Sequence, residues 1–103
     1  FQALQHRAAD MWIQTESSHA AVYRAAWALS EQLEEAPFLV AAAKAYSGDA
    51  AGFVCGETIQ LFGGVGFTWE YDPHIYFKRV KTLQQLYGST RNQLEMALRA
   101  KGL

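Results

Sequence analysis

One glycine-rich break divides this sequence, because residues 60–73 read QLFGGVGFTWEYDP. Three of the four residues from 63 to 66 are glycine, which interrupts a helix and permits positive φ angles. Asp72 suits a helix N-cap, and Pro73 suits a first helical residue. The break therefore predicts one helix that ends near Leu61 and a second that begins near Pro73.

Apolar and small residues recur at helical spacing on both sides of the break. They predict four helices, over about residues 3–33, 37–61, 73–86 and 91–101. Pro37 ends the first, because the residue before a proline disfavours helical backbone, and Gly102 ends the last. No segment alternates polar and apolar residues as a strand does. The fold class expected is all-α, an antiparallel up-and-down bundle of about four helices without a sheet.

Three local patterns predict how the helices pack and where the last helix begins. The apolar face of the first helix should hold Leu4, Ala8, Met11, Thr15, Ser18, Val22, Ala26, Leu29 and Leu33. Each helical glycine costs about 1 kcal/mol relative to alanine. Gly48, Gly52 and Gly56 should therefore admit the backbone of a neighbouring helix. Residues 90–93, Thr-Arg-Asn-Gln, have capping-box spacing and should start the last helix.

Composition narrows the functional class. The 103 residues fit one small domain, and 50% hydrophobic residues predict a packed core. A net charge of −1 argues against a general nucleic-acid binder, and no apolar run of 18 residues exists to span a membrane. The single cysteine fits a reducing, cytoplasmic location. The chain opens at Phe1 without Met or a secretory signal, so we expect a piece of a longer protein.

Residue chemistry alone allows two interpretations of the glycine segment, a tight turn between helices or a loop that binds phosphate through its backbone N–H groups. A Rossmann fingerprint needs a preceding strand and a P-loop needs Gly-Lys-Ser/Thr, and the sequence has neither. His6, His19 and His74 lack metal-binding spacing, so no metal site is predicted. The basic run at residues 78–81 fits a solvated helix face, an anionic ligand or a neighbouring subunit.

Residues 60–79, QLFGGVGFTWEYDPHIYFKR, resemble the C-terminal domain of acyl-CoA dehydrogenases. That family carries Gln-x-Phe/His-Gly-Gly-x-Gly-Phe/Tyr, followed by an Arg-bearing helix. Residues 1–11, FQALQHRAADM, and 43–50, AKAYSGDA, resemble its preceding helices. The resemblance covers the whole chain. It implies that residues 1–103 are the C-terminal helical-bundle domain of such an enzyme, without its N-terminal helical and middle β domains.

The resemblance also implies a function for the parent protein. It would be an FAD-dependent enzyme of fatty acid or lipid metabolism that acts on a CH–CH bond and oxidises an acyl-CoA thioester to the 2,3-enoyl-CoA. Electrons would pass to electron-transfer flavoprotein or a similar acceptor. This chain would supply FAD contacts and the interface of a homo- or hetero-oligomer, a dimer or tetramer, and would be inactive alone. The alternatives are a non-catalytic partner subunit or assembly module, and a helical interaction domain without a flavin role.

The family's cofactor contacts carry over to particular positions. The segment that lies against the adenosine diphosphate portion of FAD, bound largely by a neighbouring subunit, matches Gln60, Leu61, Phe62, Gly63 and Gly64. Gln2 matches a glutamine that reaches the same cofactor. Thr90 matches a threonine near the flavin, and Asn92 stands where many members have Gln.

The substrate contacts implied are Tyr87 and Gly88, which should border the acyl thioester. Many members carry their catalytic base in a Tyr-Glu-Gly-Thr segment, which reads Tyr-Gly-Ser-Thr here, at residues 87–90. Gly88 occupies the Glu position and has no titratable group, so this chain is expected to hold no catalytic residue. The base then comes from an earlier helix or from another subunit, or the chemistry has changed.

Overall fold

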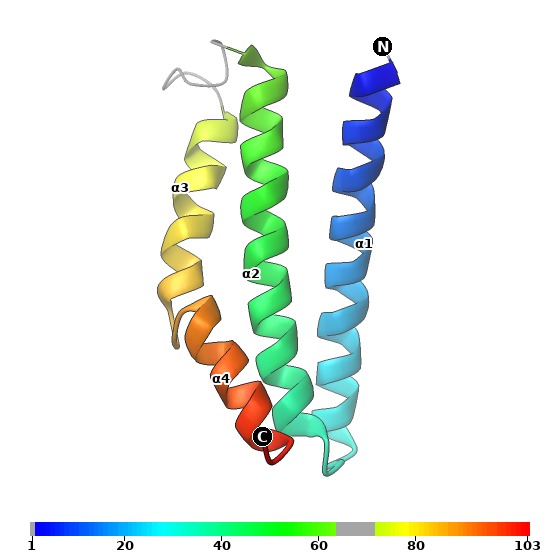
Figure 1. The fold of residues 1–103 in the computed structure, drawn as a ribbon, viewed down its shortest axis with the longest axis vertical. Coiled ribbons are helices and arrows are strands. Elements are labelled where there is room, and N and C mark those ends of the chain that lie inside the picture. Colours follow the sequence, from blue (N-terminus) through cyan, green and yellow to red (C-terminus); the bar gives the residue numbers. More distant parts are fainter. Residues whose placement is uncertain (1, 64–71) are drawn as a thin grey trace.

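The computed structural model describes residues 2–63 and 72–103 and is helical throughout. Its helices are α1 (Gln2–Ser30), α2 (Ala36–Leu61), α3 (Asp72–Gln85) and α4 (Thr90–Ala100). α2 runs antiparallel to α1, and α3 and α4 follow each other back along the other side of α2 (Figure 1). Within these ranges no strand occurs. The all-α bundle predicted from the sequence is confirmed, with α2 at its centre.

The buried core consists largely of alanine. α2 contributes Ala36, Ala41, Ala43, Ala45, Ala50 and Ile59, while Ala25 and Ala28 of α1 and Ala97 of α4 meet it. No large side chain in the described part of the chain is fully buried. Short side chains on both sides of an interface let helix axes approach closely. The helices of the bundle therefore pack closely, but each core residue buries little apolar area.

The predicted apolar face of α1 is wrong at both ends of the helix, because Leu4 (50% exposed) and Ala8 in the first turns face solvent and the last turns bury other residues than expected. Ala25 and Ala28 are buried against the bundle, whereas Ala26 and Leu29 are exposed, and Val22 is 48% exposed. The alanine-lined surface of α2 favours small partners, so the larger side chains of α1 turn outward. Between the two ends, Thr15 and Ser18 are partly buried as expected, and each hydroxyl donates to the carbonyl four residues earlier.

The sequence predicts that the three helical glycines of α2 admit a neighbouring backbone, and this prediction is wrong. A Cβ on Gly48 would lie 3.2 Å from Gln84 Cγ, and one on Gly52 would lie 3.6 Å from Lys81 Nζ. Both neighbours are side chains of α3. A Cβ on Gly56 would meet nothing within 4 Å. Two of the glycines therefore make room for polar side chains, and the third faces open space.

α1 ends earlier than Pro37 suggested. Gln32 has φ 54°, its N–H bonds to Leu29 O, and Leu33 N–H reaches back to Ala28 O at 3.0 Å. These two bonds form a Schellman motif, which satisfies the last carbonyls of the helix. Pro37 lies in the first turn of α2, as the helix predicted from residue 37 requires, and its missing N–H costs nothing there. None of the helices in the described ranges is long and apolar enough to cross a membrane.

Candidate functional site

The site residues predicted from the sequence lie at two levels of the bundle. Gln2 begins α1 and residues 60–63 end α2, so these lie at one end (Figure 1). Residues 87–92 lie in the α3–α4 turn and the first turn of α4. Thr90 is hydrogen-bonded to Asp49, which lies 11 residues before Gln60 on α2. At 1.5 Å per residue, the two levels are about 16 Å apart along α2.

The first level presents exposed groups beside an ion pair. The side chains of Gln2, Gln60 and Phe62 are exposed, and Phe62 N–H closes the helix on Thr58 O at 3.1 Å. Gly63 has φ +60°, and a Cβ there would meet nothing within 4 Å. Arg7 and Glu57 join α1 to α2 here at 3.7 Å. Gly64, also predicted to contact the cofactor, lies outside the described residues.

The second level is an unusual turn between α3 and α4. Tyr87 has φ 61° and Gly88 φ 106°, so two successive residues have positive φ angles. Gly88 N–H bonds to Gln85 O at 3.3 Å, and the Tyr87 side chain is 92% exposed. A positive φ is common for glycine but disfavoured for tyrosine. Contacts from outside the turn must therefore hold Tyr87 in place.

One such contact fixes the end of α3. Lys44 of α2 donates from Nζ to Leu83 O at 3.3 Å and to Gln84 O at 3.4 Å. The last carbonyls of a helix have no intrahelical partner and carry partial negative charge. The ammonium therefore satisfies both carbonyls and joins the C-terminus of α3 to α2 just before the turn.

A second set of contacts fixes the start of α4. The N-cap is Ser89, whose Oγ accepts from Asn92 N–H at 3.3 Å and donates to Asn92 Oδ1 at 3.1 Å. The predicted capping box at residues 90–93 is thus wrong by one residue. Thr90 does not cap the helix, because its hydroxyl donates to Asp49 Oδ1 at 3.0 Å. Gln84 Nε2 donates to the same oxygen at 3.2 Å, so Asp49 joins α2, α3 and α4.

The third contact comes from Gln93, which sequence reasoning missed. Its side chain donates from Nε2 to Tyr87 O at 2.7 Å, and the residue is only 5% exposed. The available signal was a polar residue one helical turn before the buried Ala97, on the core face of α4. A buried polar group at such a position requires a partner. Only the folded chain identifies that partner as the turn carbonyl.

A side chain at Gly88 would be strained in this conformation. A Cβ would lie 3.1 Å from Gln93 Nε2 and 3.3 Å from Asn92 Cβ, so both neighbours would have to shift, in addition to the unfavourable φ. The position that the family resemblance matches to a catalytic Glu is therefore disfavoured for any side chain here, by backbone conformation and by tight packing. Beside the turn, an apolar pocket of about 390 Å³ extends between α2 and α3, lined at this end by Leu86 and Tyr87.

Other candidate groups do not form a reactive centre. In the parts of the chain that the structure places, no three His, Cys, Asp or Glu side chains gather as metal ligands. Cys55 is partly buried on α2, and burial raises the pKa of its thiol. In the basic run, Lys81 Nζ lies 5.3 Å from the centre of the Phe77 ring. This contact gives the lysine a local structural partner on its own helix.

Residues 1–102 match the family model described as the C-terminal domain of acyl-CoA dehydrogenase. The chain belongs to the acyl-CoA dehydrogenase family. Acyl-CoA dehydrogenase IpdE2 of Mycobacterium tuberculosis is 38% identical over 94 residues, which cover 91% of this chain and 28% of that protein. The short-chain-specific acyl-CoA dehydrogenase of Megasphaera elsdenii is 35% identical over 96 residues, 91% of this chain and 24% of that enzyme.

A solved structure has the same fold. It is described as the electron transferring flavoprotein of Acidaminococcus fermentans, in work towards a mechanism of flavin-based electron bifurcation. The TM-score is 0.89 at 33% identity, and the match covers 98% of this chain and 26% of that one. This acyl-CoA dehydrogenase chain thus spans about a quarter of the length of the relatives that it matches. The family resemblance stated from residues 60–79 is confirmed.

Proposed function

We propose that this chain is the C-terminal helical domain of an FAD-dependent acyl-CoA dehydrogenase that oxidises an acyl-CoA thioester to the 2,3-enoyl-CoA. The observation that carries the proposal is the α3–α4 turn, which falls at the family's Tyr-Glu-Gly-Thr position. It exposes Tyr87 and anchors Thr90 to α2. The domain would supply contacts to cofactor and substrate, while the missing three-quarters of a typical relative would supply the remainder.

The first level of the site fits the diphosphate part of FAD. The exposed amides of Gln2 and Gln60 lie at the same end of the bundle as Gly63, whose open backbone permits close approach of a phosphate. In our proposal these residues hold the cofactor together with Leu61, Phe62 and Gly64. The cofactor, when bound, supplies the hydride acceptor of the reaction.

The second level fits the other end of a cofactor and the substrate. The Thr90 hydroxyl donates a hydrogen bond to Asp49, so the hydroxyl oxygen can still accept a hydrogen bond from a ligand. Asn92 is exposed two residues further along α4. The separation of about 16 Å along α2 supports contacts by the two levels to different parts of a cofactor, or to two cofactor copies.

The proton of the substrate must be removed by a group that lies outside this turn. Gly88 carries no base, and its φ of +106° and close neighbours disfavour any side chain there. We infer that the base is supplied by a preceding helix or by another subunit. A desolvated carboxylate there would have the raised pKa that suits a general base.

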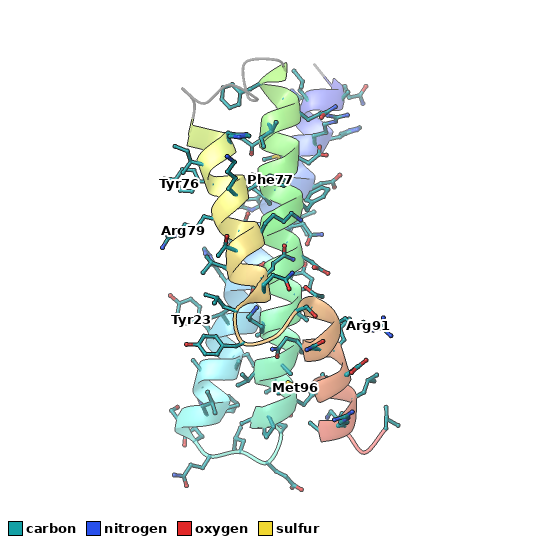
Figure 2. The ribbon with its side chains drawn as sticks, turned by 90° about the vertical axis from the view of Figure 1, so that its left-hand side faces the viewer. Tyr23, Tyr76, Phe77, Arg79, Arg91 and Met96 are labelled. Carbon is teal, nitrogen blue, oxygen red and sulfur yellow. The ribbon has the colours of Figure 1, made fainter. Side chains whose placement is uncertain are left out.

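The outer surface supports assembly with other domains or subunits. Trp12 is 66% exposed, Tyr23 74% and Trp27 52%, all on α1. On α3, Tyr76 is 60% exposed and projects away from the bundle (Figure 2). Aromatic side chains of this size are typical of interfaces. We propose that they are covered in a homo- or hetero-oligomer, whose electron acceptor would be electron-transfer flavoprotein or a similar protein.

A non-catalytic partner subunit remains the second candidate, and the Gly88 position, which disfavours any side chain, favours it. The test is anaerobic titration of the complete, FAD-loaded protein with acyl-CoA of several chain lengths. Bleaching of the flavin absorbance supports the dehydrogenase. No bleaching, followed by bleaching once a second subunit of the family is added, supports the partner role. The 103-residue chain alone is expected to retain no FAD and to self-associate in sedimentation experiments.

A further inference from the structure

Gln93 is the one polar residue of the described chain that is buried, at 5% exposure. Its amide donates from Nε2 to Tyr87 O at 2.7 Å, across six residues of sequence. The same nitrogen lies 3.1 Å from the place where a side chain on Gly88 would begin. One amide thus bonds to Tyr87 and lies beside Gly88, the two residues of this turn that have positive φ angles.

We propose that Gln93 is a positioning residue, which holds the Tyr87–Gly88 turn in the conformation that borders the acyl thioester. The proposal rests on the proposed function for its substrate. Gln93 does not touch the reacting atoms, so it acts through the turn.

Tyr87 is the strained residue of the turn. A tyrosine at φ 61° is disfavoured, so its conformation must be imposed from outside. The bond to Gln93 pulls the Tyr87 carbonyl toward α4, and α4 is itself fixed by Ser89 at its N-cap and by Thr90 on Asp49. A short bond from a buried donor on a fixed helix defines the carbonyl position more tightly than a bond to water does.

Gln93 also occupies the space that a residue-88 side chain needs. Its amide and the Asn92 Cβ close this space together, at 3.1 Å and 3.3 Å from the point where a Cβ on Gly88 would lie. Gly88 and Gln93 therefore form an interdependent pair, because the amide keeps this position only beside a glycine. A side chain at position 88 would push the Gln93 amide away and weaken its bond to Tyr87 O.

The first test is Gln93→Met in the complete, FAD-loaded protein, since methionine keeps the length of the side chain and lacks the donor. Loss of one buried hydrogen bond should raise KM for acyl-CoA about tenfold and leave kcat within about twofold. Gln93→His, which keeps an Nε2–H donor at similar reach, should restore KM to within about threefold. The matched control is Gln85→Met on the exposed surface of α3, which should change neither constant. An unchanged KM in Gln93→Met, or an equal rise in Gln85→Met, would overturn the proposal.

A second measurement separates this inference from the proposed function. Wild-type protein that oxidises no acyl-CoA would sink the proposed function, but the pairing is still measurable by urea unfolding. The loss of stability caused by Gly88→Ala should be smaller in a Gln93→Ala background than in the wild type, because the amide no longer obstructs the new methyl group. Equal losses in the two backgrounds would refute the Gln93–Gly88 pairing.

Discussion

Gly88→Ala tests whether the α3–α4 turn is as constrained as its contacts indicate. At φ +106°, an alanine carries a strain of about 1–3 kcal/mol. Its methyl group would also lie 3.3 Å from Asn92 Cβ, which α4 holds in place, and 3.1 Å from Gln93 Nε2. Moving that amide weakens its bond to Tyr87 O and costs about 1 kcal/mol more. We expect a total loss of about 3 kcal/mol of unfolding free energy.

Two glycines of the same chain serve as controls for this measurement. Gly102 has φ +80° but open space around its Cβ position, so Gly102→Ala should cost only the strain, about 1 kcal/mol. Gly56 lies inside α2 with nothing within 4 Å, so Gly56→Ala should stabilise the chain by about 0.5–1 kcal/mol.

The assay is urea unfolding of the four proteins followed by helical circular dichroism, with a common slope for the extrapolation. The expected order of stability is Gly56→Ala, wild type, Gly102→Ala and Gly88→Ala. If Gly88→Ala loses no more than Gly102→Ala, the contacts with α4 carry no energy, and packing does not disfavour a side chain at position 88.

Further substitutions test other contacts of the bundle and the burial of Cys55. Asp49→Ala should cost about 1–2 kcal/mol, because two hydrogen bonds that join three helices are lost. Glu57→Ala, which removes a partly exposed ion pair, should cost at most about 0.5 kcal/mol, and urea midpoints compare the two variants. Ser89→Ala should cost about 1 kcal/mol through loss of the N-cap, and an unchanged melting temperature would contradict that. Burial raises the pKa of the Cys55 thiol, so the unfolded chain loses this proton at lower pH than the folded one; stability should fall as pH rises above about 8.5, and Cys55→Ala should remove that dependence.

Local signals predicted the helices well because each depends on neighbouring residues. The positive φ of Gly63 and the position of Pro37 in a first helical turn both agree with the sequence. The end of α1 at Ser30 escaped prediction because Gln32, a residue without strong turn preference, takes the left-handed position. The left-handed conformation of Gln32 is stabilised by the two Schellman hydrogen bonds, which form only in the folded chain.

Packing partners were harder to predict, because helical spacing shows which residues share a face but not what that face meets. The alanines of α2 select Ala25 and Ala28 over larger residues of α1, a preference that is visible only once the two helices are paired. Likewise, Ser89 and Thr90 are both suitable caps, and Asp49 decides between them by accepting the Thr90 hydroxyl. The site residues implied by the family lie, where the structure describes them, at helix ends and in the α3–α4 turn. Their roles stay predictions, and their supporting contacts were not foreseen.

These supports explain how a turn without a reactive group can retain a defined shape. Lys44 holds the end of α3, Asp49 holds the start of α4, and Gln93 holds the Tyr87 carbonyl between them. All three act from α2 or α4, so the geometry of the turn depends on the packing of the bundle more than on the residues of the turn. Because Gly88 has no titratable group and a side chain there would be strained, we expect selection on this region to act on shape and binding. In the function that we propose, a carboxylate on another element then supplies the base.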